Sequence, residues 1–398
     1  MSELQTCDVL IAGAGPAGLH LARRLAEAGA SVLVVDPLHD LRQAAFSSAA
    51  LPLAAIQDFE LPAQVQAARW QGWQLHGPGD QQRRWTAEDD LGAVLDFGAL
   101  RQWLAGQAQA RGASLWLGWA VDRWQPSAAG ASASLRGPAG AARVVACRWL
   151  VDATGQRRAL IGEPPVAAGA LVSGAGVEWL LQVPPQQWCQ WADRLSFMLG
   201  SQWVPQGYGW VFPMQPGRLK LGVCRLQDPS RQQPPLHQLL RQLQQRLALA
   251  DAPVIDRHGG LIRSTIRRRE PHQRGPLLGL GDALSTGNLL GGEGIRHAMA
   301  SSDVLAPLLL EALAGRTDQL RLYAPRLRRR LGWRWSLSGR LARRTWLSLH
   351  SSAADLRLER LLEGLQQKSS AEELSALLFD YRFERYGFKA WPYLLGLR

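Results

Sequence analysis

The chain has 398 residues, 46% of them hydrophobic and 20% charged, with a net charge of +12 at pH 7, which is typical of a globular protein with one large or two moderate cores. Its four cysteines have no C-x-x-C pair and no metal-ligand spacing, so we expect reduced thiols and no metal site. No apolar run approaches the roughly 18 to 20 residues that span a bilayer, and no signal-peptide pattern is present, which excludes an integral membrane protein and predicts a cytoplasmic one.

The sequence DVLIAGAGPAGLHLARRLAEAGASVLVVDP, residues 8–37, predicts a complete βαβ unit. Residues 9–12 form a buried strand, a helix begins at Pro16 and ends at Gly29, and residues 31–35 form a second strand. The glycines allow a sharp turn, close approach of a pyrophosphate and tight helix packing. The helix N-terminus offers N–H groups to phosphates, and an acid after the second strand binds ribose hydroxyls. The unit predicts a site for FAD or a nicotinamide dinucleotide, with contacts from Gly13, Ala14, Gly15, Pro16, Ala17, Gly18 and Asp36.

The following elements alternate between two kinds of pattern. We predict a loop and short helix over residues 46–62, a β-hairpin over 70–85, a helix over 97–110, a strand over 115–121, a loop or hairpin over 126–142 and a buried strand over 143–152. Short antiparallel strands are predicted over 178–225 and a helix over 236–249. A strand, a glycine-rich loop and a helix to about Leu313 then return to α/β patterning, and the chain is mainly helical after Arg316.

This order predicts an α/β fold in which a nucleotide-binding domain is interrupted by a second, α+β domain. We assign residues 1–65, 92–165 and 262–315 to the nucleotide-binding domain. Residues 66–91 and 166–261 form the inserted domain, and residues 316–398 form a helical, basic C-terminal region.

Three separated segments together resemble the FAD-contacting motifs of flavoproteins with the para-hydroxybenzoate hydroxylase fold. They are the glycine turn with Asp36, V-V-A-C-R-W-L-V-D-A-T-G at 144–155, and G-L-G-D-A-L-S-T-G-N-L-L-G-G-E-G-I-R-H-A-M at 279–299. Residues 204–214, V-P-Q-G-Y-G-W-V-F-P-M, contain P-x-x-Y-x-W-x-F-P and resemble the substrate-domain signature of the geranylgeranyl reductases. The resemblance spans residues 8–315 and implies a Rossmann-type FAD-binding domain interrupted by an antiparallel-sheet substrate domain, with a helical C-terminus.

The resemblance also implies residue roles. Gly281 and Asp282 match a pair that holds the ribityl chain of FAD, and residues 291–295 match a segment that lies against the isoalloxazine. The chain departs from the family pattern at Gly291, which replaces Thr, at Asn288-Leu289, which replaces Asn-Pro, and at Asp96-Phe97, which replaces Asp-Arg. The usual arginine contact therefore passes to Arg101 or is absent. The implied FAD contacts are Arg101, Asp152, Gly155, Gly281, Asp282, Gly292, Glu293, Gly294 and Ile295, and the implied substrate contacts are Pro205, Tyr208, Trp210, Phe212 and Pro213.

The activity that the resemblance implies is a FAD-dependent reduction of isolated double bonds in an isoprenoid chain. Seventeen Trp against five Tyr also favour an apolar pocket, because large rings line such pockets at low entropy cost. Tyr208 is the nearest candidate for the proton donor and equally fits a wall of the pocket. No motif identifies the electron donor, which we expect to be NADPH or a reduced electron carrier.

Other functions remain open at this stage. The D-A-T-G turn and the strand end Val35-Asp36-Pro37 resemble lycopene cyclases, although the acidic pair that would protonate a polyene is not evident. Flavin-dependent aromatic hydroxylases usually carry a histidine and a proline near the flavin, where this chain has Ser285 and Leu289. A flavin-binding protein without enzymatic activity is the last alternative.

The C-terminal region raises the question of a partner, because residues 316–398 hold 17 basic and 8 acidic residues. Such charge suits an anionic lipid surface, an acidic protein or nucleic acid, and nucleic acid has no supporting motif. Arginine clusters at 326–330 and 340–344 lie beside apolar patches at 374–379 and 391–397. We therefore predict peripheral attachment to an anionic membrane, against the alternative of a helical cap with solvated arginines.

Overall fold

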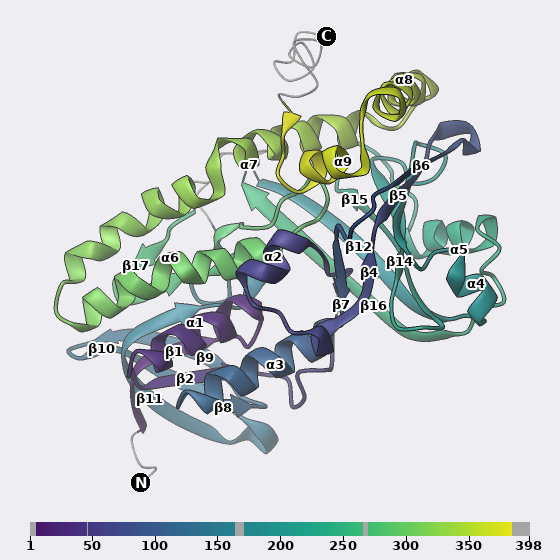
Figure 1. Cartoon of the computed structure of the whole chain (residues 1–398). Coiled ribbons are helices and arrows are strands. Elements are labelled where there is room, and N and C mark those ends of the chain that lie inside the picture. The colour runs from purple at the N-terminus through teal and green to yellow at the C-terminus, as the bar shows by residue number, and fades with distance from the viewer. Residues whose placement is uncertain (1–4, 46, 164–170, 266–269, 384–398) are drawn as a thin grey trace.

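The computed structural model describes residues 5–45, 47–163, 171–265 and 270–383 (Figure 1). The chain begins with strand β1 (Gln5–Ala12), helix α1 (Pro16–Glu27) and strand β2 (Val32–Asp36), which confirms the predicted βαβ unit. β1 and β2 are parallel, and residues 9–12 and 32–35 are buried. Continuous burial is what a parallel strand covered on both faces requires, so consecutive apolar residues specify it.

The first sheet has the strand order β17-β18-β11-β1-β2-β8, and strands β9 and β10 form a hairpin that pairs with β11. Its other strands are β8 (Ser114–Leu117), β9 (Ala120–Ser127), β10 (Gly130–Arg136), β11 (Ala142–Asp152), β17 (Gln273–Arg274) and β18 (Leu277–Gly279). Helices α1, α3 (Phe97–Ala110) and α6 (Ile295–Leu313) cover one face, and the β9–β10 hairpin packs on the other. These layers are those of the predicted Rossmann-type domain.

The single strand predicted over residues 115–121 is wrong, because the chain turns at Gly118 between β8 and β9. Gly118 has φ +77, and a Cβ there would lie 2.6 Å from the ring of His39. The Trp119 N–H donates to the carbonyl of Asp36 at 3.0 Å. β8 therefore extends the sheet beside β2, whereas β9 leaves it to pair with β10.

The second sheet has the order β16-β12-β15-β14-β13-β5-β6. Its strands are β5 (Gly72–His76), β6 (Gln82–Thr86), β12 (Leu171–Gln182), β13 (Arg194–Leu199), β14 (Gly207–Pro213), β15 (Arg218–Leu226) and β16 (Val254–Thr265). The β5–β6 hairpin confirms the prediction over 70–85. The sheet is antiparallel as predicted, except that β13 pairs in parallel with β5. The chain crosses the first domain between these two strands, so no hairpin dictates their relative direction.

Two short helices and a small sheet complete the domains. Helices α4 (Pro185–Cys189) and α5 (Leu236–Arg246) pack on the face of the second sheet that lies away from the first domain, as Figure 1 shows on the right. The predicted helix over 236–249 is present but ends at Arg246, and α4 was not predicted. A three-stranded sheet of β3 (Ala50–Pro52), β7 (Gly92–Leu95) and β4 (Gln66–Trp70), with helix α2 (Leu53–Asp58), lies where the chain passes between the two domains.

The C-terminal region is helical, as predicted, and it packs on both domains. Helix α7 (Tyr323–Ser348) runs along α6 and continues to α8 (Ser352–Lys368) and α9 (Ala371–Leu378), at the top of Figure 1. Leu327 joins the core of the first domain, and Trp346 joins the aromatic core of the second. Within the described part of the chain, no helix is long and apolar enough to cross a bilayer.

One of the two apolar patches predicted for membrane attachment is not on the surface. Leu374 and Phe379 are 1% and 9% exposed and belong to the aromatic core with Trp70 and Trp73. α9 is an amphipathic helix, and such a helix turns its apolar residues toward the core on which it packs. The apolar residues at 374–379 therefore reflect packing on the aromatic core. The patch at residues 391–397 lies outside the described residues.

Candidate flavin and substrate site

The glycine turn between β1 and α1 is built so that backbone surfaces meet closely. Gly13 has φ +117, and a Cβ there would lie 2.3 Å from the carbonyl oxygen of Ala153. A Cβ at Gly18 would lie 2.1 Å from the carbonyl oxygen of Gly13. Gly15 differs, because no described atom beyond its chain neighbours lies within 4 Å of its Cβ position. Gly15 also begins α1 without a side-chain cap, so the helix N-terminus faces open space that suits a pyrophosphate.

Asp36 closes the second strand beside this turn. Its side chain accepts hydrogen bonds from the N–H of Ala14 at 2.7 Å and of Leu38 at 2.9 Å. Each carboxylate oxygen accepts one of these bonds and keeps further acceptor capacity for ribose hydroxyls. Asp36 therefore both fixes the turn and remains able to bind the nucleotide.

Arg101 of α3 supplies a buried cation near Asp36. Its side chain donates to the carbonyl of Gln43 and lies over the ring of Phe97, and its Nε–H has no partner among the described residues. Burial lowers the pKa of Arg101, and the charges of Asp36 and Asp40 oppose that effect. A buried guanidinium N–H without a partner is costly unless a ligand accepts its hydrogen bond. The residues around Asp36 thus fit an anionic dinucleotide such as FAD.

The carboxylate of Asp152 holds the turn that follows β11. It is fully buried and accepts hydrogen bonds from the N–H and hydroxyl of Thr154 and from the N–H groups of Leu160 and Ile161, at 2.6 to 3.0 Å. These bonds shape the D-A-T-G turn, and a contact of Asp152 with FAD stays a prediction. Gly155 in this turn has φ +66 and open space at its Cβ position.

Gly281 packs between Ala17 of α1 and Ala298 of α6, and the next residue, Asp282, lines the cavity. Gly281 has φ +59, and a Cβ there would lie 2.9 Å from the Cβ of Ala17. The Asp282 carboxylate accepts from the Thr286 hydroxyl at 3.0 Å and lines the cavity. Burial raises the pKa of Asp282. The carboxylate also accepts from the backbone N–H of Gly287, and its remaining acceptor capacity fits the ribityl hydroxyls that the resemblance implies.

The glycine-rich loop before α6 is closed by its own backbone. Asn288 and Glu293 exchange two backbone hydrogen bonds, at 2.7 and 3.1 Å, and Gly292 between them has φ +67. Gly292, Gly294 and Ile295 line the cavity. The Glu293 carboxylate binds Arg296 and accepts from the hydroxyl of Tyr381 at 3.0 Å, so a contact of Glu293 with FAD stays a prediction for its backbone.

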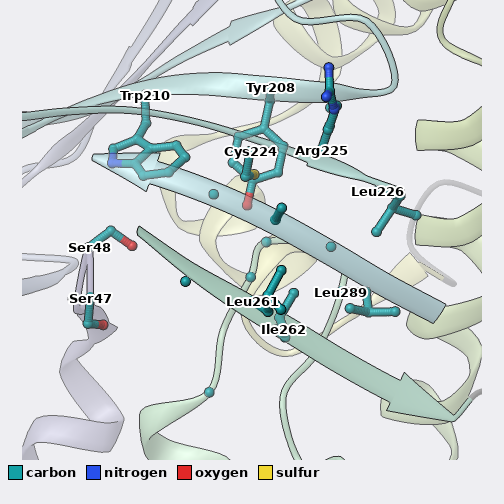
Figure 2. A pocket seen from close by; sticks show the side chains of 18 of the residues that line it. Ser47, Ser48, Tyr208, Trp210, Cys224, Arg225, Leu226, Leu261, Ile262 and Leu289 are labelled. Atoms are coloured by element: carbon teal, nitrogen blue, oxygen red, sulfur yellow. The ribbon is translucent and has the colours of Figure 1, made fainter. Parts of the chain in front are cut away.

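Strand β14 presents the predicted substrate residues to the same cavity, whose volume is about 270 Å³. Figure 2 shows the hydroxyl of Tyr208 directed into the cavity beside Trp210, with Leu261, Ile262 and Leu289 across from them. A Cβ at Gly292 would lie 3.1 Å from the Tyr208 oxygen, so this hydroxyl is next to the glycine-rich loop. Phe212 also lines the cavity, whereas Pro205 precedes β14 and Pro213 ends it without lining the cavity.

Both hydrophobic burial and hydrogen bonding hold these rings in place. Tyr208 is 6% exposed, and the centroid of its ring lies 5.0 Å from that of Trp346 in α7. Its hydroxyl hydrogen-bonds to the thiol of Cys224, and burial raises the pKa of Tyr208 well above its ordinary value. Burial also raises the pKa of Cys224 to about 12. Both groups are therefore neutral at physiological pH.

The cavity has further walls that the sequence did not reveal. Residues 174–176 of β12 and Gly260 of β16 form a floor almost without side chains, and Gly176 lies opposite Gly260 in the register of the two strands. Ser47 and Ser48 form another wall. Glycine inside a strand often marks close approach of a ligand, and this signal could have identified the floor.

Comparisons with known proteins identify relatives by sequence. Residues 8–179 match the model of a family described as lycopene cyclase protein. A digeranylgeranylglycerophospholipid reductase of Haloferax volcanii is 25% identical over 332 residues, which cover 77% of this chain and 76% of that protein.

Solved structures share the fold over nearly the whole chain. A geranylgeranyl bacteriochlorophyll reductase-like protein of Thermoplasma acidophilum superposes with a TM-score of 0.80 at 19% identity, covering 96% of this chain and 98% of that one. A p-nitrophenol 4-monooxygenase of Pseudomonas putida superposes with a TM-score of 0.70 at 18% identity, covering 95% and 98%. The chain is therefore similar to lycopene cyclases over residues 8–179 and to a geranylgeranyl lipid reductase over most of its length, and it shares the fold of FAD-dependent oxidoreductases.

Proposed function

We propose that the protein uses FAD to reduce carbon–carbon double bonds of an isoprenoid chain or a similar apolar substrate. The observation that carries this proposal is the composition of the cavity. The cavity is lined by the glycine-rich loop at 291–295 and by the rings of Phe197, Tyr208 and Trp210. Gly and Ala residues at 174–176 and 260 line it as well. Among the described lining residues, Asp282 and Arg225 are the charged ones. Such a wall gives little recognition to a polar metabolite and favours a hydrocarbon.

FAD in its reduced form supplies a hydride, so the chain must hold the double bond near the cofactor and keep water out. The rings of Tyr208 and Trp210, which line the cavity, would hold the chain of the substrate close to the glycine-rich loop. The second alkene carbon also requires a proton. The neutral hydroxyl of Tyr208 lies beside the glycine-rich loop and would deliver it.

The relative from Haloferax volcanii supports this proposal, since its name describes the reduction of a geranylgeranyl lipid. A cyclase would instead need an acid to protonate a polyene, and Asp282 is the acidic side chain among the described lining residues. Asp282 lies beside Gly294 of the cofactor loop, where a Cβ would be 3.6 Å from its carboxylate. This placement favours a role in binding FAD.

Anaerobic turnover tests the proposal. The purified protein, loaded with FAD and reduced with dithionite, is mixed with geranylgeraniol or a geranylgeranyl phospholipid. We expect reoxidation of the flavin with a matching gain of two hydrogens per reduced bond by mass spectrometry. Oxygen-dependent turnover with oxygen in the product would indicate a monooxygenase, isomerisation without net redox change a cyclase, and no turnover of any of these a binding protein.

The electron donor is part of the same proposal. We propose NADPH or a reduced protein carrier as the donor. Anaerobic mixing of the oxidised enzyme with NADPH, and separately with a reduced ferredoxin or flavodoxin, distinguishes the two by the rate of flavin bleaching. Bleaching by neither, while dithionite supports turnover, would contradict both donors.

We also propose that α7 attaches the enzyme to an anionic membrane surface. α7 contains eight arginines and no acidic residue. Its outward face carries Arg326, Arg329, Arg330, Trp333, Arg340 and Arg343, all exposed, and Trp333 is 63% exposed. Exposed basic side chains around an exposed indole fit the interface of an anionic bilayer.

Co-sedimentation with vesicles tests this attachment. We expect binding to phosphatidylserine-containing vesicles that weakens with salt, because the attraction is screened. Changing Arg326, Arg329 and Arg330 to Gln should weaken binding, whereas the same change at exposed Arg84, Arg123 and Arg136 is the matched control. Equal loss in both triple variants, or no binding at low ionic strength, would contradict the proposal.

A further inference from the structure

A buried lysine joins the two domains at the wall of the cavity. Lys220 lies in β15 and is 5% exposed. Its ammonium donates to the carbonyls of Ser47 at 2.8 Å, Ser48 at 3.2 Å and Leu95 at 3.2 Å. An ammonium has three N–H donors, and these three carbonyls use all of them.

The residue type is notable in this sequence. Lysine occurs at positions 220, 368 and 389 alone, and arginine provides every other Lys or Arg position. An ammonium is a compact donor that can point at three carbonyls around one atom, whereas a guanidinium spreads its donors over a planar fork. Three carbonyls that converge on one atom therefore suit the ammonium of lysine better than the guanidinium of arginine.

Two carboxylates reduce the cost of burying this charge. Burial lowers the pKa of Lys220, and Glu178 and Asp96 act in the opposite direction. Glu178 is 1% exposed and accepts a hydrogen bond from the indole of Trp210 at 3.0 Å. Glu178 and Trp210 lie on either side of Gly222 in the sheet. Gly222 is two residues from Lys220 along β15, so the two positions face the same side of the sheet. Burial also raises the pKa of Glu178, and the charge of Lys220 opposes that effect.

Lys220 connects two sides of the cavity, one through its side chain and the other through its backbone. Ser47 and Ser48 line it from the segment before β3, and Leu95 ends β7 just before α3. On the other side, the backbone of Lys220 pairs with that of Phe212, which lines the cavity from β14. Figure 2 shows Ser47 and Ser48 across the cavity from Tyr208.

We propose that Lys220 is a positioning residue that fixes the Ser47–Ser48 wall against the aromatic strand β14 and thereby sets where a substrate lies relative to the cofactor loops. Lys220 does not itself line the cavity, so it acts through the residues that it holds. The effect on turnover rests on the proposed function, whereas the effect on the wall does not.

The test uses FAD-loaded Lys220→Met, with Lys368→Met as the matched control because Lys368 is exposed at the end of α8. Hydrogen exchange measured by mass spectrometry should be at least tenfold faster in the peptide over residues 47–52 of Lys220→Met and unchanged in the control. Steady-state kinetics with geranylgeraniol should show kcat at least tenfold lower, while the Kd for FAD changes less than threefold.

Each outcome decides one claim. Unchanged exchange at residues 47–52 would overturn the proposal, and so would faster exchange with wild-type kcat and KM. If Lys220→Met cannot be purified with FAD, Lys220→Gln takes its place, since an amide keeps two donors without the charge. Wild-type protein that reduces no isoprenoid would contradict the proposed function instead, and the exchange comparison would then decide the role of Lys220 by itself.

Discussion

The two sides of the cavity are built from different parts of the chain. The side that we assign to the flavin presents the backbone of Gly291, Gly292 and Gly294 to the cavity. The substrate side exposes the rings of Tyr208 and Trp210 on a regular strand. A substitution in a wall made of backbone alters the turn itself. A substitution in a wall made of side chains alters one side chain and leaves the strand in place. We therefore expect substitutions on the flavin side to affect cofactor loading and those on the substrate side to affect turnover.

The largest expected effect is at Gly15. Its φ of −80° and ψ of 177° are extended, so valine fits the backbone, and no described atom beyond its chain neighbours lies within 4 Å of its Cβ position. Gly15→Val should keep the melting temperature of the apoprotein within a few degrees but remove FAD binding, because the side chain fills the space for the pyrophosphate. The visible absorbance of the purified protein reports the loss.

Gly18 sharpens this test. Gly18→Val should prevent folding itself, because its Cβ would collide with the carbonyl of Gly13 at 2.1 Å. Gly106→Ala, on α3 with open space around it, is the neutral control. A Gly15→Val protein that remains yellow would contradict the placement of the cofactor.

On the substrate side, Tyr208→Phe should lower kcat about 100-fold if the hydroxyl delivers the proton, since general acids contribute at least that much. The Kd for FAD should not change. Burial raises the pKa of Tyr208 well above 10, so we expect no loss of activity from its ionisation below pH 9. A decrease of less than threefold would make Tyr208 a wall of the pocket, and Cys224→Ala controls for the lost hydrogen bond.

A smaller effect is expected at Asp36. Loss of charge-assisted hydrogen bonds is worth about 1.5 to 3 kcal/mol per bond, so Asp36→Ala should weaken FAD binding by about 10- to 100-fold. Titration of the apoprotein with FAD, followed by flavin fluorescence, measures it. Asp40→Ala removes a nearby carboxylate that pairs with Arg42 and should leave the Kd unchanged. Equal values for wild type and Asp36→Ala would refute the ribose contact.

The smallest expected effect concerns pH. Burial raises the pKa of Asp282 in the folded apoprotein, so its ionisation destabilises the fold as pH rises above the ordinary Asp range near 3.8. Asp282→Asn should therefore melt at a higher temperature than wild-type apoprotein at pH 7, and at nearly the same temperature at pH 4. An equal difference at both values would contradict a raised pKa. FAD binding should weaken in the same variant.

The flavin side could be predicted from the sequence because its signals are local. Glycine spacing and apolar runs identified the βαβ unit, and the helical pattern gave the bounds of α3, residues 97–110, as the structure has them. The end of α6 at Leu313 was also predicted. These features depend on residues within one turn or one strand of each other.

The rest of the site depends on contacts between distant segments. Gly176 meets Gly260 only because β12 pairs with β16, and no short-range pattern reports that register. The carboxylate of Glu293 binds Tyr381 and Arg296, and no short-range pattern in the sequence predicts the contact with Tyr381. Leu374 is buried by Trp70 and Trp73, which precede it by about 300 positions, and its helix gives no sign of that contact.

The bond from Tyr381 to Glu293 has a consequence for biosynthesis. It joins residues 88 positions apart, and the carbonyl of Phe379 holds Arg296 of the same loop region. A ribosome makes the dinucleotide turn long before these residues. The glycine-rich loop before α6 can therefore be held in place only once residues 379–381 have been made. We expect flavin to be retained only after that point, so a chain that is truncated before position 379 should lose its cofactor on dilution.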